Sequence, residues 1–151
     1  MTDSIWAQWY RNDVFWAGFW SWAIAQTLKV VIGVFREKRF NFRWFVGSGG
    51  MPSSHAALVS GFTLAAGLVE GFDSGLFAVA FGFAVITMFD AQGVRRQSGC
   101  QAEALNKILD DLYAHRGLRE EPLKELFGHT PVEVFAGAFL GIATALWVCL
   151  L

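Results

Sequence analysis

Hydrophobic residues are grouped in four long stretches, separated by shorter polar segments. The stretches are Val14–Phe35, Pro52–Phe72, Gly75–Phe89 and Pro131–Leu151. A helix that crosses a bilayer needs about 20 predominantly apolar residues, so this pattern predicts about four transmembrane helices, of which the third is the shortest. Only Asp73 and Ser74 separate the second stretch from the third. These two helices are therefore predicted to form a tight antiparallel hairpin.

The polar segment before the last stretch contains a further predicted helix. Its apolar residues recur at helical spacing and lie opposite charged ones, namely Leu105, Ile108, Leu109, Leu112 and Tyr113 against Glu103, Lys107, Asp110 and Asp111. This periodicity is typical of an amphipathic surface helix. The sequence thus predicts an all-α fold, an integral membrane helical bundle with an amphipathic helix in the third loop. The chain length predicts a single membrane domain over residues 1–151.

The composition agrees with a membrane location. Hydrophobic residues make up 54% of the chain and charged residues 17%, whereas soluble domains have roughly 45–50% and 25%. The net charge of -1 lacks the basic excess that a nucleic-acid-binding protein normally has. Cys100 and Cys149 lie far apart in the chain, so we expect neither a disulfide nor a metal site from them, and no cofactor.

Basic residues are distributed unequally among the polar segments. The first loop carries Arg36, Lys38, Arg39 and Arg43, the third carries Arg95, Arg96, Lys107, Arg116, Arg119 and Lys124, and the hairpin turn carries none. The positive-inside rule therefore predicts that both basic loops face the cytoplasm. Both chain termini and Asp73 are then expected on the other side.

The first candidate for chemistry is GSGGMPSSH, residues 47–55. A glycine-rich turn that leads into a helix presents backbone N–H groups at the positive end of the helix dipole, which suits an anion. Ser53 and Ser54 are able to cap the helix, to donate hydrogen bonds to an anion, or both. His55 follows in the first turn. An ordinary helix cap with a structural histidine explains the same residues, and both interpretations stay open.

The second candidate is GHTPVEV, residues 128–134. Thr130, Pro131 and Glu133 have the spacing of a capping box with proline at the first helical position. His129 lies just before this helix, four residues from Glu133. The carboxylate of Glu133 is therefore predicted either to cap the helix or to fix the tautomer of His129 and make it a better nucleophile.

Several charged residues near the helix ends complete the inventory. Lys29 and Arg36 are seven residues apart, which places them on one helix face about 10 Å apart along the axis. Lys29 either extends to the membrane surface or faces a polar cavity. Asp90 precedes Arg95 and Arg96, whose guanidinium groups suit phosphate oxygens or lipid head groups. Two histidines and several cations around a helix start are suited to phosphoryl transfer without an obligatory metal.

Three motifs, SGGMPSSH, FDAQGVRR and FGHTPVEV, occur in this order. Together they resemble the divergent type 2 phosphatidic acid phosphatase family, also described as acid phosphatase/vanadium-dependent haloperoxidase-related. The resemblance covers most of the chain from Gln26 onward. It implies that Lys29 and Arg36 bind phosphate, that Ser53 donates to the oxyanion and that His55 is the general acid. It also implies that His129 is the nucleophile, facing His55 across the phosphate, and that Glu133 orients it.

This chain departs from the pattern of the wider superfamily at three places. Glu37 replaces a proline, Ser54 replaces a glycine, and Leu123 occupies the position of an arginine. Lys124, Arg95 or Arg96 would then supply the missing positive charge. The resemblance implies a membrane phosphatase that hydrolyses a lipid phosphate or diphosphate through a phosphohistidine intermediate, at the cytoplasmic side.

The alternative, favoured by the missing arginine, is a non-catalytic membrane protein that binds anionic lipid head groups or a partner. The expected ligand in both cases is a membrane lipid, most simply a phosphorylated one. The sequence is also compatible with assembly of this membrane protein into a homo-oligomer.

Overall fold

The computed structural model describes residues 4–38, 50–114 and 129–151, without side-chain detail for 94–96 and 110–114. All elements in these ranges are helices. In chain order they are α1 (Ile5–Tyr10), α2 (Asp13–Glu37), α4 (Ser54–Glu70), α5 (Gly75–Gln92), α6 (Val94–Ala114) and α7 (Pro131–Leu150). The predicted all-α membrane bundle is confirmed.

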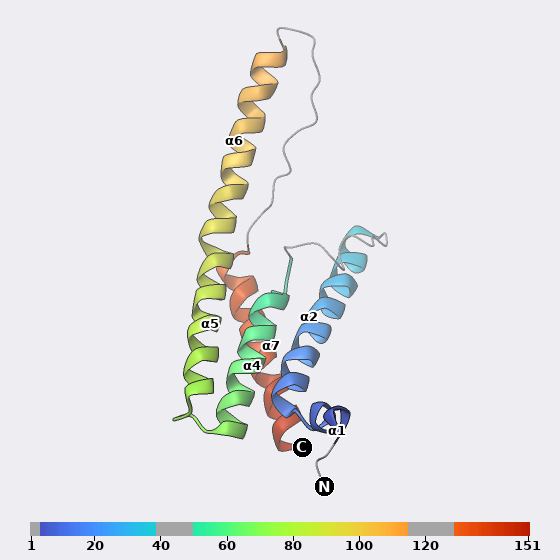
Figure 1. The fold of residues 1–151 in the computed structure, drawn as a ribbon. Helices are drawn as coiled ribbons and strands as arrows, with labels where there is room; N and C mark the ends of the chain where they lie inside the picture. The colour runs from blue at the N-terminus through green and yellow to red at the C-terminus, as the bar shows by residue number, and fades with distance from the viewer. Residues whose placement is uncertain (1–3, 39–49, 115–128) are drawn as a thin grey trace.

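Four of these helices form a bundle with α4 at its centre, in which α2 and α5 run opposite to α4 and α7 (Figure 1). Helices α2, α5 and α7 each pack against α4. Helix α6 continues in the direction of α5 and extends beyond the other helices (Figure 1). Both chain ends and the α4–α5 turn lie at one end of the bundle, and the starts of α4 and α7 lie at the other.

Three helices are long and apolar enough to cross a membrane, by length and composition, among the residues described. They are Asp13–Glu37, the stretch Gly75–Leu109 that combines α5 with much of α6, and Pro131–Leu150. Helix α4 has 17 residues, or about 25 Å of helix, which is short of the ~30 Å hydrocarbon core. The predicted count of four spans is therefore not confirmed.

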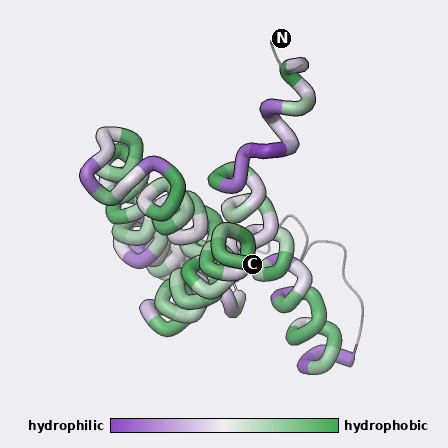
Figure 2. The backbone as a smooth tube through the Cα atoms, turned by 90° about the horizontal axis from the view of Figure 1, so that it is seen from below, coloured by the Kyte–Doolittle hydropathy of each residue, from purple (hydrophilic) through white to green (hydrophobic). Residues whose placement is uncertain are grey.

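Figure 2 shows predominantly hydrophobic colouring along the bundle and strongly hydrophilic residues where α1 meets α2.

Small residues allow the central helix to approach its neighbours closely. A Cβ atom on Gly137 or Gly141 of α7 would collide with the carbonyl oxygen of Ser53 or Ala57 of α4, respectively. On the other side, a Cβ on Gly61 of α4 would collide with the hydroxyl of Ser21. This close packing of backbones is how helices associate in a membrane, where burial of apolar surface gives little driving force.

Two polar contacts fix neighbouring helices within this apolar bundle. The hydroxyl of Ser21 in α2 donates to the carbonyl of Ala17 in the same helix at 2.6 Å, and it lies 3.5 Å from the carbonyl of Gly141 in α7. The hydroxyl of Thr63 in α4 lies 2.7 Å from the carbonyl of Val59 and 3.1 Å from the carbonyl of Ala80 in α5. Because both hydroxyls reach backbone acceptors, their burial leaves no polar hydrogen unsatisfied.

The predicted hairpin between the second and third apolar stretches is confirmed. Helix α4 ends at Glu70 and α5 begins at Gly75. Gly71 has a φ of +98°, a backbone conformation that favours glycine. The Ser74 hydroxyl accepts the amide N–H of Phe77 at 3.1 Å and so caps α5.

The short helix α1, which the hydrophobic pattern does not predict, carries aromatic residues against the start of α2. Trp9 lies 5.3 Å from Trp16 and 5.0 Å from Phe15, measured between ring centroids. The indole N–H of Trp16 donates to the carbonyl of Tyr10 at 3.2 Å. Aromatic clusters of this kind are typical of the membrane–water boundary.

Candidate functional site

The candidate site lies at the end of the bundle where α4 and α7 begin and α5 ends. The amide of Ser53 donates a hydrogen bond to the carbonyl of Glu133 at 3.0 Å, and the amide of His129 donates to the carbonyl of Ala91 at 3.2 Å. These backbone bonds join segments that are far apart in sequence. The first bond holds the start of α4 beside the start of α7, and the second holds His129 against the end of α5.

A buried histidine, His129, pairs with the partly buried Glu133 at the start of α7. Nδ1 of His129 lies 3.1 Å from Oε2 of Glu133, and His129 is only 2% exposed. Nε2 of His129 is buried as well. If Nδ1 carries the proton, it donates a hydrogen bond to the carboxylate and Nε2 keeps its lone pair. This is the state of a nucleophilic imidazole.

The same carboxylate also caps the helix. Oε2 of Glu133 accepts the amide N–H of Thr130 at 3.0 Å, and the Thr130 hydroxyl accepts the amide N–H of Glu133 at 3.4 Å. The capping box predicted from the sequence is therefore confirmed. The two interpretations of Glu133 are not exclusive, because one oxygen contacts both the backbone and the imidazole.

Lys29 reaches the site from the middle of α2. Its Nζ lies 3.5 Å from the hydroxyl of Ser54, and the residue is only 7% exposed. A buried ammonium within a membrane helix is costly unless a polar cavity or a counter-charge receives it. The structure places Lys29 inside the bundle against Ser54, and its side chain does not extend to the membrane surface.

The start of α4 has the geometry of a capped helix. The Ser53 hydroxyl accepts the amide N–H of Ala56 at 3.4 Å, and both Ser53 and Ser54 are buried. The amide groups of a first helical turn point out of the helix end, where an anion is favourably bound. Ser54 faces Lys29 of α2, while Ser53 packs against Gly137 of α7.

His55 occupies a different face of α4. Ser53, Ala56 and Ala57 are among the residues that contact α7, and His55, about 100° around the helix from each neighbour, points away from them. Its side chain is exposed. His129 and His55 are thus at the same end of the bundle, on different sides of the amino end of α4.

The remaining predicted site residues lie near helix ends, or they lie outside the residues that the structure describes. Arg36 is exposed in the last turn of α2, and Asp90 is half-buried near the end of α5. The backbones of Arg95 and Arg96 belong to the first turn of α6, but their side chains are not described. Lys124 lies outside the described residues. Within the described ranges, no group of three or more His, Cys, Asp or Glu residues has a metal-binding arrangement.

Two contributors to the site are missing from the sequence-based prediction. Gly50 has a φ of +86°, and a Cβ there would lie 3.5 Å from Cγ of Lys29. The glycine run of the motif is a signal for such a backbone conformation. The carbonyl of Ala91, which anchors the amide of His129, has no signal in the sequence because any residue would supply it.

The comparisons with known proteins agree with the three motifs. The model of the "Divergent PAP2 family" matches residues 10–144. The chain belongs to the divergent PAP2 family. A relative from Bacillus subtilis (strain 168), named "Uncharacterized membrane protein YuiD", is 42% identical over 133 residues, which cover 81% of this chain and 84% of the relative. No solved structure matches the chain.

For this member of the divergent PAP2 family, the match includes every candidate residue discussed above. It also includes α2, α4, α5 and α6 completely and most of α7. The name of this relative describes a membrane protein. This agrees with the apolar helices of the present chain.

Proposed function

We propose that this protein is a membrane phosphatase that hydrolyses a phosphorylated lipid through a phosphohistidine intermediate. The observation that carries the proposal is the contact of the buried His129 with the partly buried Glu133, with 3.1 Å between Nδ1 and Oε2. Helix capping alone accounts for Thr130 and Glu133 but not for a histidine held against the same carboxylate. An imidazole oriented in this way through one nitrogen is prepared for nucleophilic attack through the other.

In the first step, Nε2 of His129 attacks the phosphorus atom of the substrate. The N–P bond forms as the P–O bond to the lipid breaks, and His55 donates a proton to the departing oxygen. In the second step, His55 removes a proton from a water molecule, which attacks the phosphohistidine. Inorganic phosphate leaves, and both histidines return to their starting protonation states.

The phosphate oxygens would be held over the amino end of α4. Lys29 and the hydroxyl of Ser54, which lie 3.5 Å apart, would contact the anion from the α2 side. The hydroxyl of Ser53 and the amide groups of the first turn would contact the anion from the amino end of α4. Arg36, Arg95 and Arg96 are the proposed further sources of positive charge, because the chain has Leu123 at the family position of an arginine.

The proposal is tested by measuring phosphate release from phosphatidate and from a polyprenyl diphosphate with the protein purified in detergent. We expect turnover by the wild type, inhibition by vanadate as a transition-state analogue, and loss of turnover in His129→Ala. His115→Ala is the matched control, since His115 belongs to none of the motifs. Full activity in His129→Ala would exclude the assigned nucleophile.

One observation favours a second function, the binding of anionic lipid head groups without hydrolysis. His129 is only 2% exposed, so a phosphate would have to enter a closed site before Nε2 could attack it. In that case wild-type protein would bind phosphatidate in vesicles but release no phosphate from any substrate. Binding that is lost in Lys29→Met without any turnover in the wild type would support this second function.

A further inference from the structure

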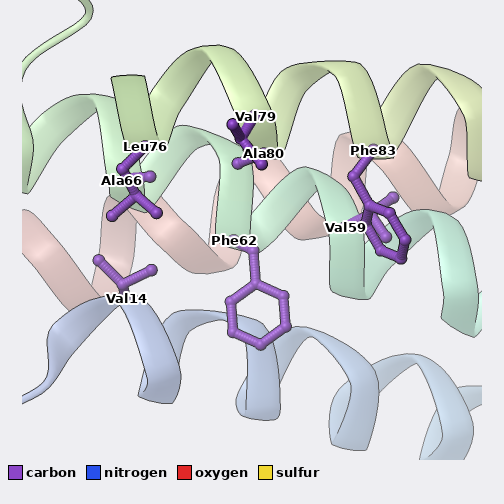
Figure 3. A pocket seen from close by; sticks show the side chains of 8 residues that line it. All are labelled: Val14, Val59, Phe62, Ala66, Leu76, Val79, Ala80 and Phe83. Atoms are coloured by element: carbon purple, nitrogen blue, oxygen red, sulfur yellow. The ribbon is translucent and has the colours of Figure 1, made fainter. Parts of the chain in front are cut away.

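An apolar groove runs along the bundle between α2 and α5, with α4 as its floor (Figure 3). Its volume is about 250 Å³. Every residue that lines it is apolar: Val14, Val59, Phe62, Ala66, Leu76, Val79, Ala80 and Phe83. The side of α5 that borders it is open to the surroundings, since Val79 is 71% exposed. In a membrane, this groove faces the hydrocarbon region.

The groove is aligned with the proposed site through the register of α4. Val59, Phe62 and Ala66 follow His55 at four, seven and eleven positions, which is one face of an α-helix. His55 therefore stands on the same stripe of α4, one turn beyond Val59. The polar end of this stripe lies beside Ser54 and Lys29, and the rest of it is the apolar floor.

The length of the stripe matches a lipid chain in one leaflet. Eleven residues of helix, from His55 to Ala66, extend about 16 Å, and one leaflet contributes about half of the ~30 Å hydrocarbon core. A lipid whose phosphate lies at the amino end of α4 would thus place one chain along the full groove. A water-soluble phosphate ester would leave the groove unused.

The width of the groove depends on a close contact between α2 and α4. A Cβ on Gly18 of α2 would collide with the ring of Phe62. Because Gly18 has no side chain, the ring leans against α2, as Figure 3 shows. The space between Phe62 and α5 is thereby left open.

We propose that this groove binds the hydrocarbon chain of the phosphorylated lipid whose head group occupies the site at the amino end of α4. The inference rests on the proposed function for the position of the head group. It adds that the protein selects substrates by an apolar chain as well as by phosphate, and that Val79 and Phe83 of α5 determine which chains fit.

The test uses two tryptophan variants of α5 that differ in their relation to the groove. Val79→Trp obstructs it, whereas Ile86→Trp is the matched control because Ile86 is 69% exposed and does not line it. The probe is phosphatidate with a photoreactive diazirine in its fatty chain, in phosphatidylcholine vesicles. We expect labelling of groove residues that falls about tenfold in Val79→Trp, as for an obstructed hydrophobic subsite, and stays unchanged in Ile86→Trp.

A second measurement separates this inference from the proposed catalysis. If the protein releases phosphate, Val79→Trp should lower kcat/KM about tenfold for phosphatidate and leave a water-soluble phosphate monoester unaffected. If it releases none, the labelling experiment still decides whether the groove binds the chain. Equal labelling of all lipid-facing sides of α5 and α7, or equal labelling of both variants, would overturn the inference. Val79→Phe, with thermal unfolding measured in parallel, provides a smaller obstruction that distinguishes blocking from misfolding.

Discussion

Oε2 of Glu133 lies 3.1 Å from Nδ1 of His129, at the first turn of α7. The same oxygen accepts the amide N–H of Thr130 at 3.0 Å, so one atom serves both the helix cap and the imidazole. These two tasks have different chemical requirements. An amide oxygen satisfies the cap as well as a carboxylate does, but it lacks the charge that stabilises an imidazolium and favours one tautomer.

The first prediction separates these tasks by substitution of Glu133. Glu133→Gln should keep the thermal stability of the wild type, whereas Glu133→Ala should lose about 1 kcal/mol of stability with the cap. Both variants should lower phosphate release by about 100-fold or more, the scale expected when a catalytic imidazole loses its orienting carboxylate. Thermal unfolding and phosphate release measure the two effects. Wild-type turnover in Glu133→Gln would leave Glu133 with a capping role alone.

The residues of this site could be predicted from the sequence to the extent that they belong to local motifs. Thr130, Pro131 and Glu133 define a helix start within four positions, and the structure has the cap that they predict. The two motifs at the starts of α4 and α7 are also at one end of the bundle, as their flanking apolar stretches require. The family resemblance added the roles, which spacing alone left open.

What could not be predicted depends on contacts between distant segments. The Lys29–Ser54 contact joins residues 25 positions apart, and nothing in either segment specifies the other. The backbone bonds from Ser53 to Glu133 and from His129 to Ala91 have no side-chain signal at all. Hydropathy also cannot distinguish a short central helix such as α4 from a full membrane span, because both are predominantly apolar.

The second prediction concerns the buried cation of the site. Lys29→Met preserves the length of the side chain but removes its charge, so the protein should bind phosphatidate about 10- to 100-fold more weakly, since a hydrogen bond to a charged group contributes about 1.5–3 kcal/mol. Lys107→Met is the matched control, because Lys107 is exposed on α6 and paired with Glu103 at 2.8 Å. Vesicle binding measures both. Equal affinity of the two variants would show that Lys29 does not contact the head group.

The third prediction tests the packing that holds the site together. Gly141→Ala would drive a Cβ into the carbonyl of Ala57 and should lower stability by about 1–3 kcal/mol, as overpacking does. Gly82→Ala is the control, because a Cβ on Gly82 of α5 meets nothing within 4 Å and alanine favours a helix by about 1 kcal/mol. Thermal unfolding in detergent should therefore distinguish the two. Similar unfolding temperatures would contradict the α4–α7 contact.

The last prediction concerns the orientation of the protein in the membrane. Lys38 and Asp73 are both exposed. Lys38 caps the end of α2 and Asp73 lies in the α4–α5 turn, and these two places are at opposite ends of the bundle (Figure 1). In the sequence, basic residues are concentrated in the loop that contains Lys38 and in the third loop, and the turn with Asp73 has none, so we expect the site to face the cytoplasm.

Two single-cysteine variants test this orientation, Lys38→Cys and Asp73→Cys. Both are made in a background that carries Cys100→Ser and Cys149→Ala. In intact cells, a membrane-impermeant maleimide should label Asp73→Cys. It should label Lys38→Cys only after the membrane has been permeabilised. The reverse result would place the basic end outside, and the proposed phosphatase would then draw its substrate from the opposite leaflet.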